Sequence, residues 1–136
     1  DRGGNEMKVK WFGRDLNLHS VWDSALVDEQ QLSFTEYAEK LQRHTSSEDV
    51  IAWWDINPRD WISESAQIRE TVYPKLSPKG AKDKKGQPAL PELSYNYVYQ
   101  FTPVMEQRLG QAGVRLAAYL NAIYAAPQPL AKEPAR

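Results

Sequence analysis

The sequence predicts an all-α fold that carries one small strand or β-hairpin near its N-terminus. Two observations favour helices: apolar residues recur every three or four positions in most segments, and residues that cap helix N-termini precede those segments. A third observation sets the first segment apart, because apolar residues and lysines alternate there with the period of a strand. With 136 residues, the chain has the length of one domain.

A short strand is expected directly after a glycine-containing turn. Residues 7–11 alternate between apolar side chains and lysines, and Gly13 ends the alternation. The preceding run Gly3-Gly4-Asn5 permits positive φ angles, which is typical of a turn. Such a turn could also offer backbone N–H groups to a phosphate or a nucleobase, although a plain turn is the commoner interpretation.

Four helices are expected between residues 17 and 73, each behind a residue that caps helix N-termini. The capping residues are Asn17, Ser33, Ser46 or Ser47, and Asn57. Ser33 is followed by Glu36 at the spacing of a capping box, and Pro58 occupies the first position of the fourth helix. Pro74 ends that helix, because proline has no backbone N–H to continue it.

The remainder of the chain is expected to contain a long loop and two helices. The stretch 74–94 is rich in proline, glycine and lysine, which indicates a loop. A short aromatic helix over 95–101 should follow, after which Thr102 caps and Pro103 begins the last helix. Within it, Gly110 and Gly113 indicate the close approach of another helix. The predicted buried stripe of that helix consists of Met105, Leu109, Ala112, Leu116, Leu120 and Ile123.

The composition excludes several classes of protein. The net charge is -1, with Lys+Arg 17 against Asp+Glu 18, so a broad basic surface is not the basis of partner binding. Cysteine is absent, which excludes disulfides and thiolate metal ligands. No apolar run approaches the ~18 residues that a membrane-spanning helix needs. Residues 126–136 are rich in proline and alanine and are expected to form a disordered tail.

His19 and Asp23 are the strongest candidates for metal ligands. They lie four residues apart on one predicted helix, so both side chains face the same side. An imidazole nitrogen and a carboxylate oxygen at this spacing can converge on one zinc ion, which accepts both donor types. A closed zinc site needs about four ligands, so this pair is incomplete by itself. From spacing alone, an ordinary helical ion pair is the commoner interpretation.

Two further features have both a functional and a structural interpretation. Trp53 and Trp54 could stack on nucleobases, but such a pair more often provides core packing and one exposed ring. The lysines between residues 75 and 85 could guide a polyanion, but a solvated loop is the favoured interpretation.

Several runs of the sequence, taken in order, resemble one family of enzymes. The runs near the N-terminus are Asp1-Arg2-Gly3-Gly4-Asn5, Val9-Lys10-Trp11-Phe12-Gly13 and Asn17-Leu18-His19-Ser20-Val21-Trp22-Asp23. Residues 61–73 and 109–121 fit the same pattern. Together they resemble the zinc-dependent single-strand nucleases with 3′-nucleotidase activity, of the mung bean nuclease and nuclease P-one/S-one type. These enzymes share a superfamily with bacterial zinc phospholipases C, so the resemblance implies a multi-helix bundle of that type.

The resemblance also implies roles for individual residues. His19 and Asp23 would hold one zinc ion of a three-zinc cluster. The residues that would contact the nucleobase of the substrate are Arg2, Gly3, Gly4 and Asn5. The planar guanidinium of Arg2 can stack on a base.

The activity implied is hydrolysis of single-stranded DNA or RNA and of 3′-nucleotides, giving products with 5′-phosphates, with zinc assisting the attack of water on phosphorus. Residues 1–125 would be the C-terminal part of one zinc nuclease domain. The missing N-terminal half of that domain would carry the other zinc ligands and would be needed for activity. The resemblance further implies a secreted or periplasmic enzyme that acts on nucleic acid and not on membranes.

Two alternatives to a nuclease stay open. One is a phosphoesterase like zinc phospholipase C, and the other is a non-catalytic helical fragment that kept the fold and lost the metals. The turn Arg2-Gly3-Gly4-Asn5 favours the nuclease over the phospholipase. The retained pair of His19 and Asp23 argues against a non-catalytic fragment.

Overall fold

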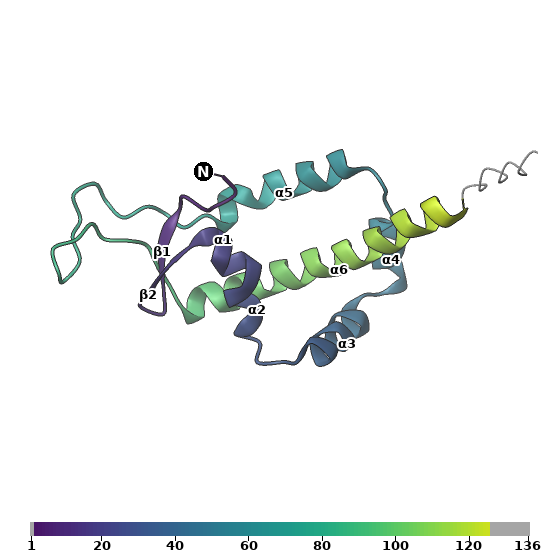
Figure 1. Cartoon of the computed structure of the whole chain (residues 1–136), viewed down its shortest axis with the longest axis horizontal. Coiled ribbons are helices and arrows are strands. Elements are labelled where there is room, and N and C mark those ends of the chain that lie inside the picture. Colours follow the sequence, from purple (N-terminus) through teal and green to yellow (C-terminus); the bar gives the residue numbers. More distant parts are fainter. Residues whose placement is uncertain (1, 126–136) are drawn as a thin grey trace, which may run out of the picture.

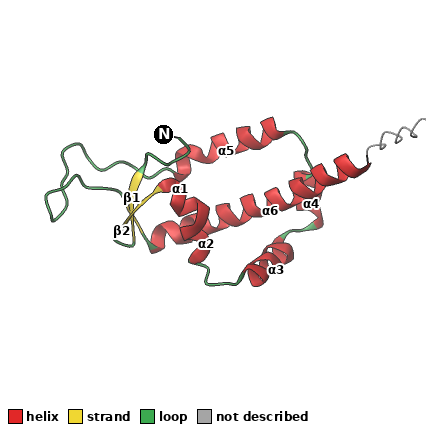
Figure 2. Cartoon of the chain, viewed as in Figure 1, coloured by secondary structure: helices red, strands yellow, loops and turns green. Residues whose placement is uncertain are grey.

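Most of the chain is helical, and its longest helix forms the axis of the molecule (Figure 1, Figure 2). This computed structural model describes residues 2–125, and both Asp1 and the predicted tail at 126–136 lie outside the described residues. The longest helix is α6 (Tyr95–Ala125), and α5 (Pro58–Val72) runs antiparallel to it. A small sheet lies at the end where α6 begins. The predicted all-α class with a small β element near the N-terminus is confirmed.

The sheet consists of three short strands in the order β2-β1-β3. β1 (Lys8–Trp11) and β2 (Arg14–Asn17) form an antiparallel hairpin. Phe12 and Gly13 connect them with φ angles of 48° and 77°, the left-handed conformation that suits a two-residue hairpin turn. The strand or hairpin expected around residues 7–11 is therefore a hairpin.

β3 (Glu92–Leu93) corrects the prediction that the whole stretch 74–94 is a loop. It pairs in parallel with β1, and Trp11 lies opposite Leu93 in the register. The Glu92 side chain accepts a hydrogen bond from the Gly13 backbone N–H at 2.9 Å. Two residues are too few to give a periodic pattern, so this strand is defined by its long-range pairing: the Lys10 and Phe12 backbone N–H groups donate to the Pro91 and Leu93 carbonyls.

All four predicted helix starts are confirmed. The side chains of Asn17, Ser33, Ser46 and Asn57 each accept a hydrogen bond from a backbone N–H in the first turn. Ser33 and Ser46 both complete capping boxes with an acidic residue three positions later. The helices behind the second and third caps are α3 (Phe34–His44) and α4 (Ser47–Trp53).

The first helix contains a π-helical turn that no sequence pattern predicts. α1 (Leu18–Ser20) continues into the π segment η1 (Val21–Ala25) and then into α2 (Leu26–Asp28). The Leu26 N–H donates to the Val21 carbonyl, five residues earlier instead of four. The fully buried Val21 and Leu26, which this hydrogen bond joins, both face the core.

α6 corrects the prediction of two separate helices over 95–101 and from residue 103 onward. It continues through Pro103, and Thr102 does not cap it, because its hydroxyl accepts a hydrogen bond from Gln30 Nε2 at 3.2 Å. Pro103 lies on the exposed side of the helix, where water can reach the carbonyl that loses its N–H partner. Phe101 and Met105 are buried on either side of it and hold the helix against the core.

The buried stripe predicted for the last helix is wrong beyond its first member. Met105 is buried, but the other five members of the predicted stripe, Ala112 and four large apolar residues, are exposed. The exposed large ones are Leu109, Leu116, Leu120 and Ile123, at 38–58%. They are exposed because none of the described elements covers this face of α6. The buried residues of that part of α6 are Gln111, Arg115 and Ala118.

The two glycines of α6 differ in their surroundings. A Cβ at Gly110 would lie 3.1 Å from the Trp53 ring, so the predicted close approach of another helix is confirmed there and involves α4. A Cβ at Gly113 would meet nothing within 4 Å, so the same prediction is wrong at this position. Trp53 is half-buried beside Gly110 and Trp54 is exposed, which fits the structural interpretation of that pair.

The core lies where the sheet, the first helix and the start of α6 meet. The Tyr97 ring lies between those of Trp11 and Phe101, with centroid separations of 6.3 Å and 4.4 Å. Within residues 2–125, no helix combines the length and the apolar character needed to cross a membrane.

Candidate functional site

A left-handed turn lies directly before β1. The φ angles of Arg2, Gly3 and Gly4 are 49°, 65° and 89°. The Asn5 side chain donates from Nδ2 to the Arg2 carbonyl oxygen at 2.9 Å and closes the turn. The turn predicted at Gly3-Gly4-Asn5 is confirmed, and Arg2 shares its left-handed conformation.

Gly4 packs this turn against the start of α1. It is buried, and a Cβ at this position would lie 3.0 Å from the His19 backbone nitrogen and 3.3 Å from the Leu18 Cβ. The Gly4 carbonyl accepts hydrogen bonds from the backbone N–H groups of Met7 and His19, at 3.1 Å and 3.4 Å. Only glycine allows both this approach and the left-handed backbone. The contact fixes the turn beside His19.

His19 and Asp23 line one cavity together with the turn. The cavity has a volume of about 280 Å³, and its lining residues are Gly3, Leu18, His19, Trp22, Asp23, Val72 and Tyr73. The side chains of His19 and Asp23 are both exposed to it from the same helix. The turn and the helix were predicted separately, and the structure brings them together at this cavity.

The His19 ring is oriented by the turn. Its Nδ1 lies 3.3 Å from the Gly3 carbonyl oxygen. Because a carbonyl oxygen only accepts, Nδ1 is the donor in this contact, and in the neutral ring this places the lone pair on Nε2. A histidine that donates one ring N–H to a backbone carbonyl presents the other nitrogen in the form that binds a metal.

A tyrosine from the far part of the chain supports the wall of the cavity. The Tyr97 hydroxyl donates to the Val72 carbonyl at 2.7 Å and accepts from Trp22 Nε1 at 2.8 Å. Burial raises the pKa of Tyr97 to about 12, so the hydroxyl stays protonated and keeps donating at neutral pH. The Tyr97 side chain thus links α6 to the last residue of α5 and to the π segment by two hydrogen bonds.

Comparison with known proteins identifies the family. The family model described as S1/P1 Nuclease matches residues 1–125. This chain belongs to the S1/P1 nuclease family. The resemblance seen in the sequence is confirmed.

Three curated relatives are similar to this member of the S1/P1 family. Endonuclease 3 of Arabidopsis thaliana is 30% identical over 138 residues, which cover 97% of this chain and 46% of that protein. Endonuclease 5 of the same plant is 31% identical over 146 residues, covering 96% and 46%. Nuclease S1 of Aspergillus oryzae is 28% identical over 137 residues, covering 93% and 48%. The chain spans about half the length of the curated relatives it matches.

His19 and Asp23 fit one part of a zinc site in this S1/P1 family chain. Imidazole nitrogen and carboxylate oxygen are both zinc donors, and the orientation of His19 leaves Nε2 to bind. Residues 2–125 hold no group of three or more His, Cys, Asp or Glu side chains placed to bind a metal ion. A structural zinc site takes about four ligands and a catalytic site about three. His19 and Asp23 therefore offer two donor groups, fewer than either kind of site takes.

The proposed base-contacting residues divide into two groups. Gly3 lines the cavity and Gly4 lies beneath it. Arg2 and Asn5 belong to the same turn but do not line this cavity. The Arg2 side chain is 85% exposed, and its Nε lies 3.5 Å from Glu6. Its guanidinium is therefore accessible at the rim of the turn.

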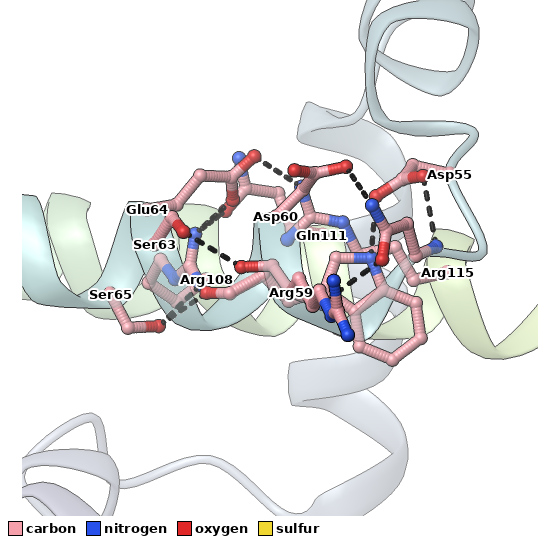
Figure 3. Close-up of polar contacts among 11 residues, drawn as sticks. Asp55, Arg59, Asp60, Ser63, Glu64, Ser65, Arg108, Gln111 and Arg115 are labelled. Carbon is pink, nitrogen blue, oxygen red and sulfur yellow. Dashed lines mark hydrogen bonds and ion pairs between the residues drawn. The ribbon is translucent and has the colours of Figure 1, made fainter.

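A second polar cluster joins α5 to α6 at a place farther from the cavity on both helices (Figure 3). Glu64 accepts from Arg108 Nη1 at 2.7 Å and from Arg115 Nη2 at 2.6 Å. These hydrogen bonds, that of Arg115 first, lower the pKa of Glu64. Arg108 also donates to the Ser65 hydroxyl at 2.7 Å and to Gln111 at 2.6 Å. The cluster fixes α5 on α6, so that the end of α5 reaches the cavity.

Several residues of the cavity region were not predicted as functional, among them Trp22, Val72 and Tyr97. In the sequence, Trp22 and Val72 were part of runs that resemble the family, and Tyr97 was part of a short aromatic helix. Trp22 lies between the two predicted ligands in the sequence, which is the one signal that could have marked it. The contact of Trp22 with Tyr97 spans 75 positions, and no local pattern predicts it.

Proposed function

We propose that residues 1–125 are the C-terminal part of one zinc nuclease domain. The complete enzyme is a phosphodiesterase that hydrolyses single-stranded DNA or RNA and 3′-nucleotides to 5′-phosphate products. The observation that carries the proposal is the meeting of Gly3, His19 and Asp23 at one cavity in a chain of the S1/P1 nuclease family. The relatives named endonuclease and nuclease support this activity.

In this proposal His19 and Asp23 hold one zinc ion of a cluster of three. Zinc supplies Lewis acidity to the phosphate and lowers the pKa of water. The Gly3 carbonyl orients His19 through Nδ1, so that Nε2 points its lone pair away from the turn's carbonyl. Asp23 contributes a negative oxygen ligand from the π segment of the same helix.

The turn of residues 2–5 is proposed to hold the nucleobase next to the phosphate. Its three left-handed residues place backbone groups beside the cavity. The exposed guanidinium of Arg2 is planar and suits stacking on a base. The Asn5 amide is fixed by its bond to the Arg2 carbonyl and can contact a base edge. An unstacked base fits such a place, which favours single strands as substrates.

The remaining zinc ligands are proposed to come from the N-terminal half of the same domain, which acts as the partner of this chain. The exposed apolar face of α6 supports this proposal, because Leu116, Leu120 and Ile123 lie where packed helices would bury them. The proposed location, secreted or periplasmic, follows from the family alone, and no membrane contact is proposed.

The test is the change His19→Ala in the complete enzyme. The zinc content should fall by about one ion per chain, since removing one of about three protein ligands opens the site. The rate of single-stranded DNA hydrolysis should fall with it. His44→Ala is the matched control, because His44 is exposed on α3 and, within residues 2–125, its side chain hydrogen-bonds only to the Lys40 carbonyl, at 2.9 Å. Unchanged zinc stoichiometry together with an unchanged rate in His19→Ala would refute the assignment.

A further inference from the structure

The Tyr97 hydroxyl joins three separate elements behind the cavity. Tyr97 lies on the first turn of α6 and is 7% exposed. Its hydroxyl donates to the last residue of α5, Val72, and accepts from Trp22 in the π segment. Both of these partners line the cavity that His19 and Asp23 share.

The Trp22 indole is held from two sides. Its Nε1–H is bound by the Tyr97 hydroxyl at 2.8 Å, and its ring lies 6.1 Å from the Phe101 ring centroid. Trp22 directly precedes Asp23, on the helix that also presents His19. Fixing this indole therefore fixes the rotation of the helical turn that presents both ligands.

The ring and the hydroxyl of Tyr97 have separable tasks. The ring packs against Trp11 and Phe101 in the core. Among the residues that the structure describes, the hydroxyl makes only the two hydrogen bonds to Val72 and Trp22. Phenylalanine at this position keeps the packing and removes both links, so one substitution isolates the hydroxyl.

We propose that Tyr97 is a positioning residue of the metal site, acting through Trp22 and the end of α5 on the helical turn that carries His19 and Asp23. This inference rests on the proposed zinc function. Residues that orient metal ligands from behind typically change metal affinity by about 10–100-fold when they are removed.

The experiment compares Tyr97→Phe with Tyr99→Phe in the complete enzyme. Tyr99 is the matched control, because it lies on the same helix and is 85% exposed. Zinc affinity is measured by competition with a chromophoric chelator, using zinc alone as the probe. The Trp22 signal is followed by fluorine NMR of fluorotryptophan-labelled protein and assigned with Trp22→Phe. Tyr97→Phe should shift this signal, weaken zinc binding by about tenfold and lower kcat more than it raises KM. Tyr99→Phe should leave all of these at the wild-type values.

Further variants distinguish a failure of the positioning role of Tyr97 from a failure of the proposed zinc function. Trp22→Phe should weaken zinc binding like Tyr97→Phe, and the double variant should be no weaker than either single one, because both remove the same link. If Tyr97→Phe does not fold, Trp22→Phe tests the same link by itself. Wild-type zinc affinity and kcat in Tyr97→Phe, even with a lower Tm, would overturn the positioning role. If His19→Ala keeps all of its zinc, the proposed function itself fails.

Discussion

Gly3 and Gly4 are adjacent in the turn, and both have left-handed φ angles, but they differ in how closely other atoms surround them. A Cβ at Gly3 would meet nothing within 4 Å, whereas a Cβ at Gly4 would lie 3.0 Å from the His19 backbone nitrogen. The first glycine is required only by its backbone conformation. The second is also required by the close approach of α1, on which the position of His19 depends.

Gly4→Ala should therefore cost more stability than Gly3→Ala. The strained φ of alanine costs about 1–2 kcal/mol at either position. Displacement of the helix start adds about 1–3 kcal/mol at Gly4 alone. Denaturant unfolding of the two variants measures the difference. Equal losses would mean that the turn does not pack on the helix as described.

Arg2→Ala should change substrate binding and leave the metal content unchanged. On the proposed function, the exposed guanidinium stacks on the base, so its loss should weaken nucleotide affinity by about 1–3 kcal/mol. Arg43→Ala is the control, since Arg43 also forms an exposed ion pair with a glutamate four residues away, 3.6 Å from Glu39, on α3. Michaelis constants for several 3′-nucleotides are the measurement, and identical constants in both variants would count against the stacking role.

At the scale of elements, the packing of α5 on α6 depends on one carboxylate between two arginines. The pKa of Glu64 is lowered by Arg115 and Arg108. A lowered folded pKa means that the ionised form stabilises the fold. Its contribution is complete above the ordinary value of 4.5 and is lost as the pH falls through the lower folded value.

Glu64→Gln should make the protein less stable at neutral pH and less sensitive to acid. Glutamine cannot pair with either arginine as an ion, so the stability that the wild type loses below pH 4.5 is already absent. Glu39→Gln is the control, because Glu39 is an exposed residue that pairs only with Arg43 along α3. Urea unfolding over a pH series measures both slopes. A wild-type acid slope in Glu64→Gln would show that Glu64 does not carry this dependence.

The sequence predicted correctly those elements that are determined by interactions between residues close together in the chain. Asn17, Ser33, Ser46 and Asn57 each bond within their own first turn, so their capping function is visible within a few residues. The shared position of His19 and Asp23 at one cavity follows from a similar short-range cause, their helical spacing, while their role as ligands stays a prediction.

The missed features depend on residues far apart in the sequence. β3 exists because Leu93 packs beside β1, and Tyr97 meets Trp22 across 75 positions. Pro103 predicted a helix start by a local rule, and tertiary packing of Phe101 and Met105 overrode it. The stripe on α6 was predicted from periodicity, which gives the apolar face of a helix but not what covers it.

At the scale of the whole molecule, large apolar side chains of α5 and α6 are exposed. One face of α6 exposes Leu116 at 58% and Ile123 at 49%, and α5 exposes Ile62 at 69%. Contiguous apolar surface of this kind promotes association. The proposed two-ligand zinc site and the uncovered helix faces lie on the same chain, and both fit the proposal that the N-terminal half completes the domain.

The 136-residue chain alone should not hydrolyse single-stranded DNA, with or without added zinc. Two ligands leave a zinc ion mostly hydrated, so it should bind weakly. Adding the N-terminal half as a separate chain should restore some activity and reduce self-association, which light scattering and a nuclease assay would record. A nuclease activity of the isolated chain that requires both zinc and His19 would contradict this expectation.

The parallel pairing of β1 with β3 makes the N-terminal site depend on residues that the ribosome adds late. β1 can pair with β2 as soon as the hairpin is synthesised. The Gly13 backbone N–H, however, can bond to the Glu92 side chain only after 79 more residues have been added. Non-local parallel pairing of this kind forms slowly. Until then one edge of β1 is open and Trp11, fully buried in the finished fold, lacks the cover of Leu93. β1 is therefore completed only after residues much later in the chain have been synthesised, and the nascent chain has to be kept from aggregating until then.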